Sequence, residues 1–67
     1  MLMTIVFLQK IRSIERAKED GNNAFRNQNY DEAIALYTAG LAIDPLADTL
    51  NAVLYSNRAA AYLSVRW

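Results

Sequence analysis

The sequence predicts an all-α fold in which three helices pack as antiparallel hairpins. Apolar residues recur at spacings of three and four along most of the chain, which is the period of an amphipathic helix. Only two Gly and one Pro occur among 67 residues, and the apolar fraction of 54% argues against intrinsic disorder. We expect helices at roughly residues 3–27, 30–43 and 49–65, and the short connections between them make neighbouring helices antiparallel.

The first expected helix has one small or apolar face and one charged face. Poor helix formers at residues 26–29 end it. Residues 1–8 are almost continuously apolar; they lack the basic residues and the cleavage site of a secretory signal, and they are too few to cross a bilayer. We favour a place in a core or an interface for them, while an artefact of gene prediction or expression and membrane contact stay open. The predicted packing face of this helix is Phe7, Ile11, Ile14, Ala17, Gly21 and Ala24 or Phe25.

The second and third expected helices have clear start and stop signals. Asn29 is predicted to act as an N-cap, with Glu32 three residues later completing a capping box. Pro45 ends the second helix because it disfavours helical geometry in the residue before it, and Asp48 is predicted to cap the third helix. The predicted packing stripes are Tyr30, Ala33, Ile34, Tyr37 and Leu41 in the second helix, and Leu50, Val53, Leu54, Asn57, Ala60, Ala61 and Ser64 in the third.

The composition excludes several classes of function. The chain has no Cys and no His, which rules out disulfides, thiolate metal sites and catalytic triads built on Ser-His or Cys-His. Seven basic and seven acidic residues give a net charge of zero, without the basic excess that is typical of nucleic-acid-binding proteins. We expect no enzyme activity, no cofactor, no metal site, and no nucleic-acid or membrane partner.

The middle of the chain resembles a tetratricopeptide repeat. It contains Gly-Asn-Asn-Ala-Phe, then Asn-Tyr-Asp-Glu-Ala-Ile-Ala-Leu-Tyr, then Gly-Leu-Ala-Ile-Asp-Pro. Gly21, Ala33 with Tyr37, and Pro45 therefore follow the order of the repeat signature, and Gly40 adds a further small residue. The resemblance implies two helices packed with their backbones close together.

A second copy of the repeat begins in the third helix. Tyr55-Ser-Asn-Arg-Ala-Ala-Ala-Tyr62 resembles the first helix of a following repeat, with Ala59 in the place of Gly21. These two positions are 38 residues apart, roughly one helical turn more than the family period of about 34. The resemblance implies about one and a half repeats in a single truncated unit: a helix extension at 1–13, a complete repeat at 14–47 and the first helix of a second repeat at 48–67.

Three positions depart from the family pattern. Ala17, Asp20 and Ala24 stand where members often carry larger residues, and Phe25 supplies aromatic bulk one position later. About one and a half repeats is also fewer than the three or so usually needed for stability. A gene-model truncation, an engineered minimal unit and a self-assembling fragment stay open as explanations.

The chain also resembles a narrower group of repeats, whose carboxylate clamp binds the acidic C-terminal tail of the large heat-shock chaperones, ending Glu-Glu-Val-Asp. Lys18-Glu-Asp-Gly-Asn22 resembles the first clamp motif and residues 55–62 resemble the second. The resemblance implies Lys18, Asn22 and Asn57 as peptide-binding residues. Arg26 joins them because it continues the i, i+4, i+8 stripe of Lys18 and Asn22. Amide groups can donate to a terminal carboxylate, and lysine adds charge attraction.

These residues also have a purely structural explanation. Asn22 and Asn57 can hydrogen-bond across a helix interface, and Lys18 can be a solvated lysine. Arg58 can extend the positive field or cover apolar surface with its stem. The aromatic residues are predicted to belong to the core rather than to a ligand site: Tyr37, Tyr55 and Tyr62.

Two functions compete at this stage. The first is a cytoplasmic co-chaperone module that binds acidic chaperone tails, and residues 8–16 favour it because they resemble the helix leading into a repeat block of DnaJ-type co-chaperones. The second is a structural fragment that self-assembles, most simply as a homodimer, through residues 3–8 and the third helix. A charge-dependent response to a Glu-Glu-Val-Asp peptide distinguishes the two.

Overall fold

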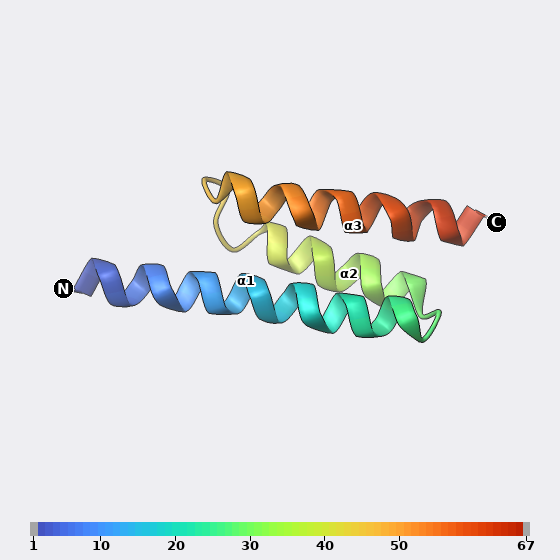
Figure 1. Ribbon diagram of the computed structural model, residues 1–67, viewed down its shortest axis with the longest axis horizontal. Coiled ribbons are helices and arrows are strands. Elements are labelled where there is room, and N and C mark those ends of the chain that lie inside the picture. Colours follow the sequence, from blue (N-terminus) through green and yellow to red (C-terminus); the bar gives the residue numbers. More distant parts are fainter. Residues whose placement is uncertain (1, 67) are drawn as a thin grey trace.

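The computed structural model describes residues 2–66 and confirms the all-α prediction. Within this range the elements are α1 (Leu2–Arg26), α2 (Tyr30–Leu41) and α3 (Asp48–Arg66), with no strand between them. Successive helices are antiparallel, and α2 lies between α1 and α3 (Figure 1). Met1 and Trp67, the ends of the expected extension and of the expected second repeat, lie outside the described residues.

The turn between α1 and α2 is tight and fixes the geometry of Asn29. Gln28 adopts a left-handed φ of 64°, and the backbone N–H of Asn29 donates back to the carbonyl of Ala24 at 2.9 Å. Asn29 is held at φ −88° and ψ 71°, and its side chain makes no capping hydrogen bond. Asn29 therefore occupies the predicted N-cap position of α2, but the predicted capping box with Glu32 is wrong. The tight turn holds Asn29 away from the extended geometry that a side-chain cap requires.

The turn between α2 and α3 is held by side chains. Asp44 Oδ1 accepts a hydrogen bond from the backbone N–H of Leu46 at 3.0 Å, and Asn51 Nδ2 donates to the Asp44 carbonyl at 2.8 Å. The prediction that Asp48 caps α3 is wrong, because Asp48 lies in the first turn of the helix. The first helical hydrogen bond is instead accepted by the carbonyl of Ala47, from the backbone N–H of Asn51. The Asp48 carboxylate still lies at the positive end of the helix dipole.

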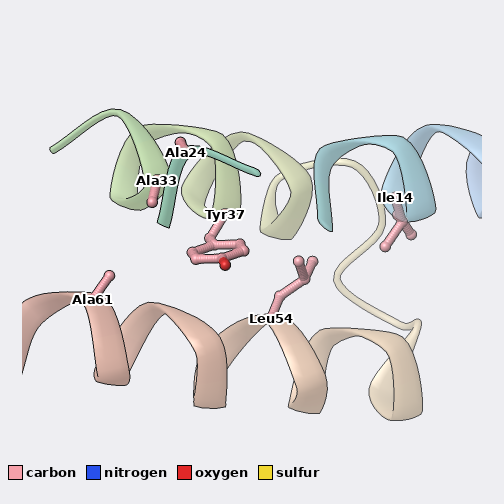
Figure 2. Packing of buried hydrophobic residues seen from close by; sticks show 6 residues of the cluster. All are labelled: Ile14, Ala24, Ala33, Tyr37, Leu54 and Ala61. Carbon is pink, nitrogen blue, oxygen red and sulfur yellow. The ribbon is translucent and has the colours of Figure 1, made fainter. Parts of the chain in front are cut away.

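The core consists largely of small residues that let the helices approach. A Cβ added at Gly40 would lie 2.9 Å from Cβ of Ala17 and 3.1 Å from Cδ1 of Leu54, so α2 contacts both neighbours closely there. The Tyr37 ring points from α2 toward α3 (Figure 2). The buried hydrophobic residues are Ile14, Ala24, Ala33, Tyr37, Leu54 and Ala61.

Some residues of the predicted packing faces are exposed. α2 has 12 residues against 25 in α1, so it lies beside only the second part of α1, and the first turns of α1 extend past it (Figure 1). An apolar side chain is buried only where another element lies against it, and α2 covers one side of α3. The prediction that the following residues pack in the core is wrong: Phe7, Val53, Tyr55, Ala60 and Tyr62.

Candidate functional site

Lys18, Asn22 and Arg26 lie on one stripe of α1, as their spacing predicts. α1 runs without interruption to Arg26, so residues four apart are neighbours on its surface. Gly21 allows this part of α1 to approach α2 closely, because it has no Cβ. A Cβ at this position would lie 2.4 Å from Cε1 of Tyr37. Asn22, the next residue, is half-buried at the same close approach.

The Asn22 carboxamide joins all three helices. Its Oδ1 accepts a hydrogen bond from the Tyr37 hydroxyl of α2 at 2.5 Å, and a second from Nδ2 of Asn57 of α3 at 3.2 Å. Asn22 and Asn57 are 35 positions apart in the sequence, yet the fold brings their side chains into contact. The structure thus places two of the candidate residues in one hydrogen-bonded cluster, which we call the Asn22 cluster (Asn22, Tyr37 and Asn57).

The Lys18 ammonium has a carboxylate partner on its own helix. Its Nζ lies 2.9 Å from Oε2 of Glu15, and both side chains are partly exposed. The hydrogen bond that Lys18 donates to Glu15, followed by the charge of the same carboxylate, raises the pKa of Lys18 above its ordinary value of 10.5. Lys18 is therefore positively charged at neutral pH, and any carboxylate that binds it has to compete with Glu15.

The two arginines near this stripe differ in how they are held. Arg26 is exposed and donates to Oδ1 of Asn23, one turn back on α1. Its charge lowers the pKa of Tyr37, although burial raises that pKa by more. Arg58 donates from Nη1 to Oγ1 of Thr38 at 3.2 Å, and its guanidinium lies 5.2 Å from the ring centroid of Tyr55. Arg58 thus links α3 to α2.

Two polar contacts were not predicted from the sequence. Tyr37 was predicted to belong to the core, and its ring is buried at 1% exposure, but its hydroxyl also belongs to the Asn22 cluster. A buried tyrosine usually has a partner for its hydroxyl, so the choice of Tyr over Phe was the available signal. Asn51, buried at the start of α3, was missed as well; a polar residue beside an apolar stripe was the signal there.

Two cavities lie away from the Asn22 cluster, in the part of the chain that the structure describes. One of about 230 Å³ is lined by residues of α1, of the α2–α3 turn and of the first turn of α3, including Ile11, Ile14 and Leu50. A second lies beside the first turns of α1 and is lined by Val6 and Phe7. No cluster of three or more metal-ligating side chains occurs in the part of the chain that the structure describes. Within residues 2–66 we find no helix with the length and apolar character needed to span a membrane.

The chain is similar to segments of longer proteins. It is 50% identical over 56 residues to the DnaJ homolog subfamily C member 7 homolog of Dictyostelium discoideum, a match that covers 84% of this chain and 10% of the relative. It is 41% identical over 61 residues to DnaJ homolog subfamily C member 7 of Mus musculus, covering 91% of this chain and 12% of the relative. It is also 41% identical over 63 residues to Tetratricopeptide repeat protein 4 of Homo sapiens, a match that covers 90% of this chain and 16% of the relative.

No protein-family model and no solved structure matches the chain. The chain spans between a tenth and a sixth of the length of the three relatives described above. The resemblance found in the sequence is thereby confirmed: the chain is a tetratricopeptide-repeat segment, homologous to parts of DnaJ homolog subfamily C member 7 and of Tetratricopeptide repeat protein 4.

Proposed function

We propose that the chain is a protein-interaction module of the co-chaperone type, which binds the acidic C-terminal tail of a heat-shock chaperone through a partial carboxylate clamp. Asn22 and Asn57 donate hydrogen bonds to the terminal carboxylate, Lys18 supplies positive charge, and Arg26 extends that charge along α1. The module acts without catalysis, in the cytoplasm. Residues 14–47 form its complete repeat.

The observation that carries the proposal is the position of Asn22 and Asn57 together beside Lys18, because the hydrogen bond between the two amides is also what their structural explanation predicts. Their side chains meet at 3.2 Å although they come from different helices, and both are half-buried rather than enclosed. Lys18 lies one helical turn before Asn22, so a positive charge adjoins the two amides. Two amides beside a lysine form a suitable donor set for a carboxylate.

Titration with a peptide ending Glu-Glu-Val-Asp tests the proposal. Few contacts offset the cost of association, so we expect a Kd of about 0.1–1 mM, weakened further by salt because the site is exposed. Lys18→Ala and Asn57→Ala should each weaken binding. Arg12→Ala removes the same charge from an exposed position of α1 off the stripe and serves as the matched control.

Two further comparisons sharpen this titration. Glu15→Gln removes the carboxylate that competes for Lys18, and we expect binding to strengthen by about twofold, as for an exposed ion pair. The same peptide with an amidated C-terminus should bind more weakly than the free acid. Equal binding of the amidated and free-acid peptides would contradict the clamp.

We propose self-association as a second function, favoured by the exposed apolar side chains of α1. Residues 2–10 are all exposed, and the apolar ones include Leu2, Met3, Ile5, Val6 and Phe7. An exposed apolar patch of this kind is typical of an interaction surface, and a C2 homodimer is the simplest way to cover it. Sedimentation equilibrium should show a dimer for the wild type and a monomer for Phe7→Glu. A wild-type chain that stays monomeric over the whole micromolar range would exclude the homodimer.

A further inference from the structure

The hydroxyl of Tyr37 is a polar group at the edge of the core. Tyr37 is 1% exposed, and its ring is held in place by the close approach of Gly21, where a Cβ would lie 2.4 Å from Cε1 and 2.6 Å from Cδ1. The ring therefore has little freedom to shift. Its hydroxyl reaches Oδ1 of Asn22 at 2.5 Å. A phenylalanine would fill the same volume, so the packing of the ring does not explain the hydroxyl.

The hydrogen bonds of the Asn22 cluster determine which way the Asn22 carboxamide faces. A carboxamide oxygen has two lone pairs, and Oδ1 accepts from both the Tyr37 hydroxyl and Nδ2 of Asn57. The opposite atom of the carboxamide, Nδ2, carries two hydrogens that are not engaged by any hydrogen bond among residues 2–66. Asn22 is half-buried, so these donors remain free for a ligand.

We infer that Tyr37 is a positioning residue for the proposed binding site: its hydroxyl holds the Asn22 carboxamide so that the Nδ2 hydrogens are presented to the terminal carboxylate of an acidic peptide. This inference rests on the proposed function. Tyr37 does not touch the peptide; it acts through Asn22. Without the hydroxyl, only Asn57 opposes rotation of the carboxamide, and a rotated carboxamide would offer its oxygen to the carboxylate, which repels it.

The hydroxyl is suited to this role at physiological pH. Burial raises the pKa of Tyr37 above its ordinary value of 10.0, and the opposing effect of the Arg26 charge is smaller. The phenol is therefore fully protonated near neutral pH and acts as a donor there. An acceptor in its place could not pair with Oδ1 of Asn22.

Binding of paired peptides to Tyr37→Phe tests the inference. This variant keeps the ring and removes one atom. We expect the Kd for the free-acid Glu-Glu-Val-Asp peptide to rise about five- to tenfold, the loss expected for one hydrogen bond, while the weaker binding of the amidated peptide stays unchanged. Tyr62→Phe removes an exposed hydroxyl of α3 and serves as the matched control, with no change for either peptide.

The outcomes separate the inference from the function on which it rests. If the wild-type chain prefers the free acid and Tyr37→Phe retains that preference in full, the positioning role is wrong and the clamp stands. If the wild-type chain shows no preference for the free acid, the clamp itself fails, and the positioning role fails with it.

A measurement on the wild-type chain covers the case in which Tyr37→Phe does not fold. Nuclear Overhauser contacts from the Tyr37 hydroxyl proton report which end of the Asn22 carboxamide faces it. We expect contacts to the Asn57 side-chain amide hydrogens and only weak ones to those of Asn22. Strong contacts between the hydroxyl proton and the Asn22 Nδ2 hydrogens would show the carboxamide turned the other way and would overturn the inference.

Discussion

The two ends of α1 differ in packing, and the part that is richer in apolar residues is the exposed one. Near the N-terminus, residues 2–10 are exposed throughout, whereas the second part of the helix contributes Ile14, Gly21 and Ala24 to the core. α2, with 12 residues, lies beside only that second part (Figure 1). Hydropathy alone therefore does not decide burial in this chain. Side chains are buried where a small residue on one helix meets a partner on the next.

The same contrast separates the proposed functions. The second part of α1 carries the stripe of Lys18, Asn22 and Arg26. In the same turn, Gly21 lies in close contact with the Tyr37 ring of α2. The first part offers mainly apolar side chains, and none of those at residues 2–10 is buried. A specific polar site requires fixed donors, whereas self-association requires only apolar area.

Ile14→Ala should have the largest effect, because Ile14 is 1% exposed and belongs to the core. Removing a buried isoleucine side chain to alanine leaves a cavity, and we expect the free energy of unfolding to fall by about 3 kcal/mol. Urea denaturation followed by circular dichroism measures it, and complete unfolding of the variant agrees with the prediction as well. A loss below about 1 kcal/mol would mean that the core does not extend to Ile14.

Gly21→Ala should be the next most damaging change, even though alanine favours a helix over glycine by about 1 kcal/mol. The new methyl group would lie 2.4 Å from the Tyr37 ring, so the ring or the helix has to move. We expect a net loss of about 2 kcal/mol, within the range for overpacked cores. Thermal unfolding gives the sign directly, since a variant as stable as the wild type would show that the Tyr37 ring or the helices can shift at no cost.

The sequence predicted the fold well because its signals are local. Helical periodicity, the break before α2 and Pro45 each act within a few residues, and the small residues Gly21 and Ala33 identify the repeat. The spacing of Lys18 and Asn22 likewise predicted a common stripe on α1. Periodicity could place both on a helix, but it could not show what faces them.

What escaped prediction depends on which side chains meet after the helices pack. The hydrogen bond from Tyr37 to Asn22 joins residues 15 positions apart, and its existence follows from the depth of the Gly21 contact rather than from any local pattern. The side chain of Asn29 does not cap α2 for a similar reason, although the residue occupies the predicted N-cap position: the closure of the turn onto Ala24 fixes its backbone. Exposure of the first turns of α1 was missed because burial depends on the length of α2.

Tyr37→Phe should have a moderate effect on stability that depends on pH. At pH 7 the variant loses a hydrogen bond and leaves Asn22 Oδ1 with one donor, and we expect a loss of about 1 kcal/mol. Burial raises the pKa of Tyr37 in the folded chain, so its contribution to stability is fully present below pH 10 and is lost as the pH rises through the folded-state pKa.

The difference between Tyr37→Phe and the wild type should therefore shrink between pH 7 and pH 11. The raised pKa of Lys18 also lowers stability above pH 10.5, but Lys18 is present in both chains and cancels in the comparison. Urea titrations of the two chains at several pH values measure the effect. A constant difference over the whole range would mean that the Tyr37 phenol titrates alike in the folded and unfolded chains.

Ile5→Ala should have the smallest effect on the folding of the single chain, and it forms a matched pair with Ile14→Ala on the same helix. Ile5 is 53% exposed, against 1% for Ile14. Surface substitutions of this kind usually change the free energy of unfolding by less than about 0.5 kcal/mol. Alanine also favours a helix slightly over isoleucine, which offsets part of any loss. The measurement is urea denaturation at a protein concentration low enough for sedimentation to show only the monomer.

The dependence of the melting temperature of Ile5→Ala on protein concentration then shows whether the first turns of α1 form an interface. If residues 2–8 form the proposed homodimer contact, the melting temperature of the wild type rises with concentration through mass action, and Ile5→Ala reduces that rise while leaving the dilute value unchanged. Ile14→Ala instead lowers the melting temperature at every concentration. A large loss in dilute Ile5→Ala would show that the first turns of α1 pack within the single chain, and the contrast between the two ends of the helix would disappear.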